Sequence, residues 1–241
     1  MENKSKRNQP FAKEVDGKSR LKTAAVAMAA NKKLHATDNT GKRGSKGIVE
    51  KEVVEKITEE WPMLSQDVAE MMIKFYGLPN EITNSQINWF YNGPWKRTTV
   101  YKDGFQHDFP EPHVDMLEQV IDYHVPAEKV GDIGMLEGSL IIDRTKGEVA
   151  VHCDNEGANT LSMNMMHEVV TGKRTPQEAR QFIVEELPKY LMNRSAPYAE
   201  EFQFELPQTE QIDPDETLVK DEALTQAVEK VKDKLGLNDN K

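Results

Sequence analysis

The feature that most constrains the fold is a pair of short apolar segments on either side of a tight-turn sequence. Ile87, Trp89 and Tyr91 stand at every second position, as in a strand with one buried face. The turn sequence Asn92-Gly93-Pro94 follows, and residues 96–101 then read as a second strand. Strands joined by so short a turn pair antiparallel. The centre of the chain is therefore predicted to be a sheet built from hairpins.

Two more turn signals and several helical patterns complete the predicted fold. Asp103-Gly104 and Lys146-Gly147 each separate two strand-like segments, as hairpin turns do. Pro112 is expected to begin a helix that runs to about His124, since proline suits a first helical turn. Further helices are predicted over residues 48–60, 64–76, 158–171 and 176–191, the last one capped by Thr175. The pattern indicates an α+β fold in which an antiparallel sheet of hairpins packs against helices.

The charges divide the chain into a basic arm and an acidic body. Residues 1–47 hold 12 Lys/Arg and 4 Asp/Glu, whereas the remainder holds 19 and 37. We predict a flexible basic arm over 1–47 that contains an alanine-rich helix from Lys13 to Leu34, and a globular domain over 48–192. Prolines indicate a linker over 193–212. Residues 213–241 are expected to form an amphipathic helix and a tail, with four apolar residues at helical spacing, Leu224, Val228, Val231 and Leu235.

The composition limits the cellular location and the chemistry of the chain. The longest apolar run, Ala24 to Ala30, is far shorter than the roughly 20 residues that span a bilayer. We find no secretory signal, and a single cysteine excludes an internal disulfide. These observations predict a cytoplasmic protein without a membrane span.

The basic arm has two interpretations. A net charge of +8 over residues 1–47 can attract nucleic acid or anionic lipid. The arm is poor in the aromatic residues on which bases stack, with Phe11 as its single Phe, Tyr or Trp. We favour a solvated arm that keeps the chain soluble or folds back on the acidic body, and nucleic-acid binding through residues 1–47 is the alternative.

Histidines and carboxylates gather around two prolines. His107, Asp108, His113 and Asp115 lie within nine positions, and the prolines between the histidines turn the chain so that the two rings can converge. These groups bind zinc or iron and also transfer protons. We favour structural histidines. The alternatives are a divalent-metal site, formed by His107, His113 and a more distant His152, and acid–base catalysis by His107, His113 and Asp115.

The sequence His152-Cys153-Asp154 suggests a nucleophile, but strand alternation argues against it. Cys153 shares a strand face with Val149 and Val151, so we expect it in the core, with its neighbour His152 on the opposite face. A buried apolar face also disfavours the reactive thiolate.

Aromatic and basic residues around the first turn form a candidate binding surface. Trp89 and Trp95 flank the turn, and Lys96 and Arg97 follow. An exposed aromatic patch there would mark an interaction site. We expect both tryptophans to be buried instead, with the two basic residues on a solvated strand.

Three segments together resemble a family of uncharacterised bacterial proteins. They are Tyr76-Gly77-x-Pro79-x-Glu81, Trp89-x-x-Asn92-Gly93-Pro94-Trp95-Lys96-Arg97 and Leu117-Glu118-Gln119-x-Ile121-Asp122-Tyr123. The resemblance covers roughly residues 60–185 and implies no activity, cofactor or catalytic residue.

The sequence therefore favours a non-enzymatic protein-binding module that acts through a protein partner or self-association. A metal-dependent or acid–base enzyme that uses His107, His113 and Asp115 is the first alternative. Nucleic-acid binding through the arm is the second.

Overall fold

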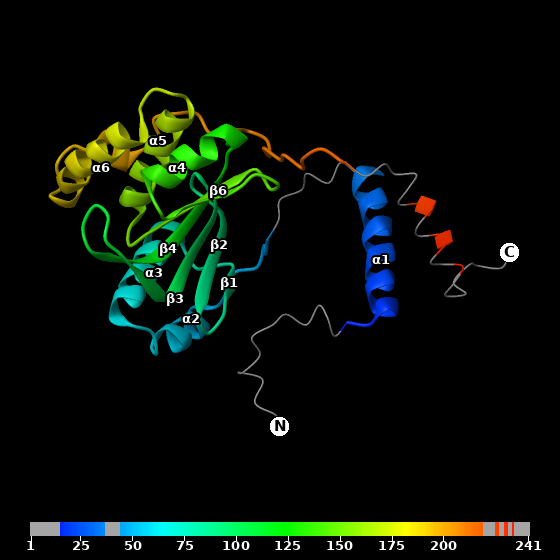
Figure 1. The fold of residues 1–241 in the computed structure, drawn as a ribbon. Helices are drawn as coiled ribbons and strands as arrows, with labels where there is room; N and C mark the ends of the chain where they lie inside the picture. The colour runs from blue at the N-terminus through cyan, green and yellow to red at the C-terminus, as the bar shows by residue number, and fades with distance from the viewer. Residues whose placement is uncertain (1–14, 37–43, 219–224, 227–228, 231–232, 234–241) are drawn as a thin grey trace. The chain divides into compact units, whose positions relative to one another are not determined.

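The chain divides into two compact units. A computed structural model describes residues 15–36 and 44–218, together with positions 225, 226, 229, 230 and 233. One unit comprises residues 1–41 and 216–241, and the other comprises residues 42–215 (Figure 1). The first unit contains helix α1 (Gly17–Ala36), which confirms a helix in the described part of the basic arm. The four apolar positions of the expected C-terminal helix lie outside the described residues.

The second unit is built on a six-stranded antiparallel sheet, which confirms the predicted α+β fold. Its strand order is β1-β2-β3-β4-β6-β5, and every neighbouring pair is antiparallel. The strands are β1 (Glu81–Ile82), β2 (Gln86–Asn92), β3 (Trp95–His107), β4 (His113–Asp122), β5 (Leu140–Asp143) and β6 (Glu148–Cys153). The predicted turn between β2 and β3 is present, and Gly93 adopts a φ of +56° there.

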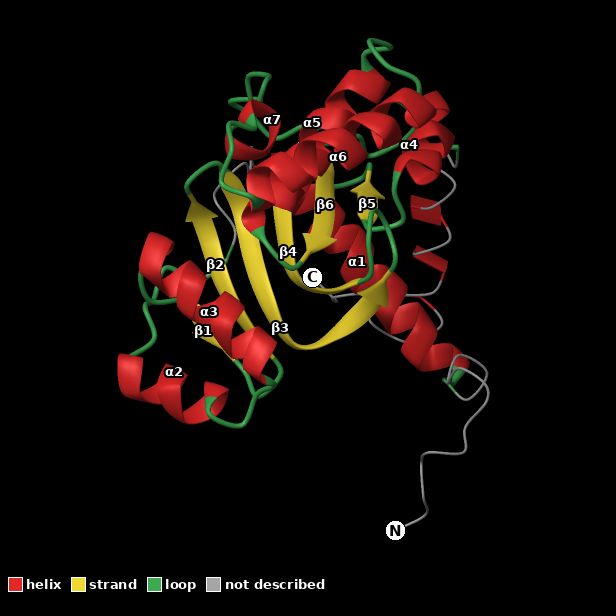
Figure 2. Ribbon diagram, turned by 90° about the vertical axis from the view of Figure 1, so that its left-hand side faces the viewer, coloured by secondary structure: helices red, strands yellow, loops and turns green. Residues whose placement is uncertain are grey.

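The predicted turn at Asp103-Gly104 is wrong, because β3 continues through it. The register between β3 and β4 shifts between Val100 and Phe105, and β3 curves at this end (Figure 2). A side chain at Gly104 would collide with Val114 and with the backbone of Asp115. This glycine therefore allows two strands to approach closely and does not form a turn.

The predicted helix from Pro112 to His124 is also wrong. Residues His113–Asp122 form β4, a central strand that pairs with β3 on one side and β6 on the other. Pairing on both sides satisfies the backbone of this segment, and this tertiary context overrides the local helix signal of Pro112. Residues 113, 115, 117, 119 and 121 consequently share one face of the sheet.

Helices cover one face of the sheet. In Figure 2, α3, α5 and α6 lie on the same side of the strands. The helices of this unit are α2 (Lys51–Thr58), α3 (Met63–Tyr76), α4 (Val130–Leu136) with a preceding 3₁₀ turn (Ala127–Lys129), α5 (Glu156–Val170), α6 (Pro176–Leu191) and α7 (Pro197–Glu200). The predicted Thr175 cap is confirmed, since its hydroxyl and the Glu178 carboxylate form a capping box. Neither α4 nor α7 is among the helices predicted from the sequence.

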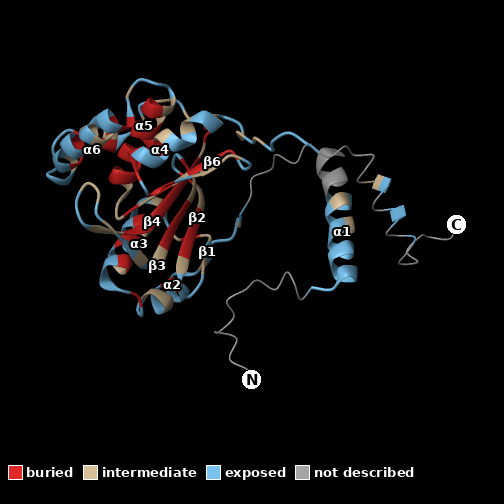
Figure 3. Cartoon of the chain, in the orientation of Figure 1, coloured by how far each residue is buried: buried red, intermediate tan, exposed pale blue. Residues whose placement is uncertain are grey.

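The core forms two clusters between the sheet and the helices, where buried residues concentrate (Figure 3). Residues 193–206, which we expected in a linker, pack against the larger cluster. Ala196 and Ala199 are buried there, and Phe202 and Phe204 pack beside them. The folded unit therefore extends beyond residue 192. Within the described residues, no helix combines the length and apolar character needed to cross a bilayer.

Candidate metal centre

Cross-strand register brings two of the singled-out histidines together. His107 ends β3, His113 begins β4, and the two are directly paired. Their ring centroids lie 4.8 Å apart. Asp115, two residues along β4, points to the same face as His113. Convergence therefore follows from a strand pair, and the helix expected after Pro112 plays no part in it.

The connection between the two strands is fixed against the helices. It contains a cis peptide bond between Phe109 and Pro110. The Arg180 guanidinium of α6 lies 3.6 Å from the centroid of the Phe109 ring and donates a hydrogen bond to the Leu136 carbonyl. These contacts hold the histidine-bearing strand ends on the helix-covered face of the sheet.

Asp115 lies between the two imidazoles. Its Oδ1 is 3.0 Å from Nε2 of His113, and its Oδ2 is 3.3 Å from Nδ1 of His107. The Ser139 hydroxyl donates to Oδ2 at 2.6 Å and lies 3.1 Å from His107 Nδ1. One ligand atom from each of His107, His113 and Asp115 lies within 4.8 Å of the others. Two imidazoles and one carboxylate thus face a common point.

The tautomer of His113 is fixed by its backbone partner. Nδ1 lies 2.7 Å from the Glu111 carbonyl oxygen, which only accepts, so Nδ1 carries the proton. In the neutral ring Nε2 is then an acceptor, yet it faces the carboxylate Oδ1, another acceptor. Although Oδ1 is within ion-pair distance, it receives no aligned hydrogen bond. The Asp115 side chain is only 9% exposed, so water has little access to it.

Two more groups extend this cluster, and sequence reasoning assigned neither of them to it. Cys153 ends β6, and its Sγ lies 3.5 Å from Nε2 of His113. The expected burial of Cys153 is confirmed, and burial raises the pKa of its thiol well above the usual value. Glu137, just after α4, is also buried, and this burial raises its pKa to about 7, with the negative Asp115 adding to the rise. Cys153 and Glu137 thus place a buried thiol and a buried carboxyl group near the partly exposed histidines.

The structure does not bring His152 to this cluster. It lies on the opposite sheet face, where its Nε2 is 3.0 Å from Glu118 Oε2. Glu118 also pairs with Arg97 at 3.1 Å and accepts from the Tyr101 hydroxyl at 3.2 Å. Burial alone would raise the pKa of Glu118, but His152 and Arg97 lower it to about 2. His152, the distant ligand of the alternative metal site, is therefore part of a separate ion-pair network.

The residues of the candidate binding surface are engaged within the protein. Trp89 and Trp95 are buried, and their indole N–H groups donate to the Gly77 carbonyl and to Glu156, respectively. Lys96 pairs with Asp122 and Glu148, at 2.6 and 3.0 Å. These contacts stabilise the sheet and its junction with α5.

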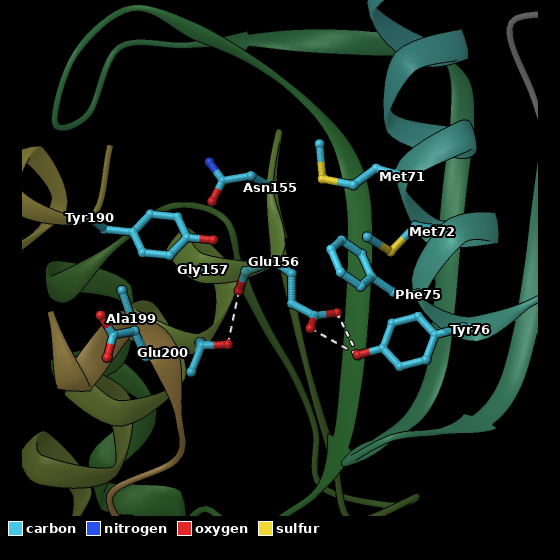
Figure 4. A pocket seen from close by; sticks show the side chains of 11 residues that line it. Met71, Met72, Phe75, Tyr76, Asn155, Glu156, Gly157, Tyr190, Ala199 and Glu200 are labelled. Atoms are coloured by element: carbon cyan, nitrogen blue, oxygen red, sulfur yellow. Dashed lines mark hydrogen bonds between the residues drawn. The ribbon is translucent and has the colours of Figure 1, made fainter. Parts of the chain in front are cut away.

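A groove between α3 and the ends of α5, α6 and α7 is a second candidate site. Figure 4 shows Met71 and Phe75 on one side, Tyr190 and Glu200 on the other, and Glu156 between them. This α3–α6 groove comprises two adjoining cavities of about 440 and 700 Å³, which share Met71, Asn155, Tyr190 and Glu200.

Glu156 forms part of the wall of the groove and is held by three donors. It accepts hydrogen bonds from the Tyr76 hydroxyl at 2.8 Å, from Trp95 Nε1 at 3.1 Å and from Gln119 Nε2 at 2.6 Å. These donors satisfy the carboxylate, so Glu156 joins the helices to the sheet and is not free for chemistry.

Comparison of the chain with protein-family models, with curated proteins and with solved structures finds no match. The cluster and the groove are therefore interpreted from their own residues.

Proposed function

We propose that this chain binds one divalent transition-metal ion, of the zinc class, through His107, His113 and Asp115. The observation that carries the proposal is the buried Oδ1 of Asp115, which lies 3.0 Å from Nε2 of His113 and accepts no aligned hydrogen bond. Burying a carboxylate oxygen without a partner is costly. A bound cation that contacts both Nε2 and Oδ1 would give this oxygen a partner.

The ligand types favour zinc over the alkaline-earth ions. Imidazole nitrogen suits zinc, copper, iron and nickel, whereas calcium and magnesium prefer oxygen ligands alone. The surrounding groups also fit a metal site, because histidine ligands usually donate their second ring N–H to a carbonyl or carboxylate. His113 does so to Glu111, and Ser139 orients Asp115 by a hydrogen bond.

Binding can be tested by calorimetric titration of zinc into metal-stripped full-length protein. We expect one ion per chain for the unaltered protein. His113→Ala should weaken binding by about 100-fold or more, since even outer-shell changes cost roughly 10–100-fold. His124→Ala is the matched control, because His124 is an exposed histidine outside the cluster and its removal should leave affinity unchanged. Equal affinity of His113→Ala and the unaltered protein would refute the proposal.

A second candidate function is the binding of a basic amphipathic helix in the α3–α6 groove, which agrees with the protein-binding module favoured by the sequence. The observation that favours it is the apolar rim. Phe75 is 66% exposed, and Leu64, Met71 and Leu191 are exposed around the same cavities. Large exposed apolar side chains gathered at a groove are typical of interaction surfaces.

The charge of the groove selects the partner. Asp67, Asp154, Glu156 and Glu200 line the two cavities, against a single basic residue, Arg194. A helix with an apolar face and lysine or arginine on its flanks complements this arrangement.

A labelled leucine–lysine model helix tests this docking by fluorescence anisotropy. We expect saturable binding that Phe75→Ser weakens. Phe105→Ser is the control, since Phe105 is also highly exposed but does not line the groove. Binding that is the same for both variants, or that is matched by a leucine–glutamate helix, would exclude the groove as the docking site.

A further inference from the structure

We infer that the 440 Å³ cavity of the α3–α6 groove binds an alkylammonium group, either a lysine side chain of the docked helix or a free amine. This assignment rests on the second candidate function, which it deepens, and is independent of the metal centre. Within the described residues, the lining of this cavity combines aromatic rings with two carboxylates and contains no basic side chain, whereas Arg194 lines the adjoining cavity. A cation carried on a hydrocarbon chain matches such a lining in both charge and apolar contact.

Aromatic rings line both sides of the cavity. Phe75 and Tyr76 of α3 lie across from Tyr190 of α6 (Figure 4). A side chain at Gly157 would collide with the Tyr190 ring, so this glycine lets the ring lie against the start of α5. The face of an aromatic ring attracts a cation within roughly 6 Å of its centroid. Phe75 has one such contact already, with the Lys74 ammonium at 5.7 Å, and Lys74 does not line the cavity.

The negative charge of the cavity is not neutralised by the described part of the chain. The three hydrogen-bond donors of Glu156 are all neutral, so they satisfy its oxygens without cancelling its charge. Glu200 accepts from the backbone N–H of Ala196 at 2.9 Å, which is also a neutral donor. Neither carboxylate takes part in an ion pair among the described residues.

The effect of this charge is seen at Tyr190. Burial raises the pKa of Tyr190, and the charges of Glu156 and Glu200 raise it further. The Tyr190 hydroxyl therefore keeps its proton at neutral pH, and its oxygen can accept a hydrogen bond from an ammonium N–H. Both carboxylates thus act on the position where the Tyr190 ring lines the cavity.

The same lining disfavours an inorganic cation. Calcium and magnesium require several oxygen ligands, and those of Glu156 are already engaged by three donors. Met71, Met72 and Phe75 add apolar surface, which cannot replace the water shell of a small ion. An alkylammonium group buries its hydrocarbon part against these side chains and brings its charge to the carboxylates.

A chemical-shift titration of the isotope-labelled full-length chain with n-butylammonium tests the inference. The neutral probe n-butanol has the same carbon chain, and sodium chloride is exchanged for the butylammonium salt at constant ionic strength. We expect saturable shifts with n-butylammonium and no saturation with n-butanol over the same concentration range.

Two variants of the lining, each with a matched design, locate the site. Phe75→Leu keeps an apolar side chain but removes the ring, and should weaken n-butylammonium binding by about 2- to 5-fold, as loss of a cation–π contact at an exposed site predicts. Glu200→Gln removes the charge but keeps an oxygen for the Ala196 N–H, and should also weaken binding. Phe105→Leu is the control, since Phe105 is exposed and lines neither cavity.

Competition with the labelled leucine–lysine helix identifies the source of the ammonium group. Displacement of the helix by n-butylammonium assigns the cavity to a lysine of the partner, and binding without displacement assigns it to a free amine. Equal binding of n-butylammonium and n-butanol, or unchanged affinity in both Phe75→Leu and Glu200→Gln, would overturn the inference. Helix binding without any response to n-butylammonium refutes the ammonium site alone, whereas absence of both refutes the second candidate function as well.

Discussion

Removal of residues 193–241 should abolish cooperative folding, whereas removal of 216–241 should not. The segment after Met192 completes the core around Asn164, which is 1% exposed. The Asn164 amide donates to the Tyr198 and Glu201 carbonyls at 2.7 and 2.9 Å, and its oxygen accepts from Gln203 N at 2.7 Å. A chain that ends at residue 192 leaves this buried side chain without any of the three partners.

The expected loss can be worked from these contacts. A buried amide without partners costs about 1–3 kcal/mol. The same truncation removes Phe202, whose ring lies 5.2 Å from that of Trp95, and Phe204, which stacks on His167 at 4.3 Å. Full burial of one large apolar side chain contributes about 1.5–3 kcal/mol. The total, on the order of 5 kcal/mol, matches the lower end of the stability of a whole domain.

Circular dichroism during thermal unfolding measures the effect. We expect the chain of residues 1–215 to unfold in one transition close to that of the full chain, and the chain of residues 1–192 to show no cooperative transition. Asn164→Ala in the full chain should lower the free energy of unfolding by about 1–3 kcal/mol. A cooperative transition of unchanged midpoint for residues 1–192 would refute the packing argument.

Two further predictions concern buried carboxylates. Glu118→Gln should lower the free energy of unfolding at neutral pH by on the order of 3 kcal/mol, because it leaves the partly buried His152 and Arg97 without their charged partner. The pKa of Glu118 falls from 4.5 to about 2 on folding. The stability difference between the unaltered protein and the variant should therefore be full above about pH 4.5 and vanish as the pH falls towards 2, as measured by urea titrations. A difference that does not depend on pH would contradict this prediction. Glu137→Gln should act in the opposite direction in metal-free protein. The pKa of Glu137 rises from 4.5 to about 7 on folding, so the unaltered protein loses stability as the pH rises through that range. The variant should therefore be more stable than the unaltered protein by up to about 3 kcal/mol near pH 8, but not near pH 5. Equal stability of the two proteins at both pH values would show that burial of Glu137 does not destabilise the fold.

Local sequence signals predicted the elements that depend on local physics. The hairpin turn at Asn92-Gly93-Pro94 and the Thr175 cap follow from turn and capping chemistry. Pro112 and Gly104 misled the prediction, because each serves a strand that is stabilised by pairing with distant residues. The alternation of polar and apolar residues from His113 to Met116 was the available signal for β4.

The candidate site was likewise predictable from the sequence only in part. His107 and His113 could be grouped from the sequence, since the prolines between them turn the chain. Cys153, Glu137 and Ser139 could not, because they reach the histidines only through the sheet order β4-β6-β5. The sequence instead suggested His152, whose position on the opposite face follows from the same alternation that buries Cys153.

The metal content of the purified full-length chain tests the central claim most directly. After incubation with zinc and removal of free metal, elemental analysis should find close to one zinc per chain, and Asp115→Asn should reduce this to background while His124→Ala leaves it unchanged. Zinc at background in the unaltered chain, or an equal content in Asp115→Asn, would contradict the account.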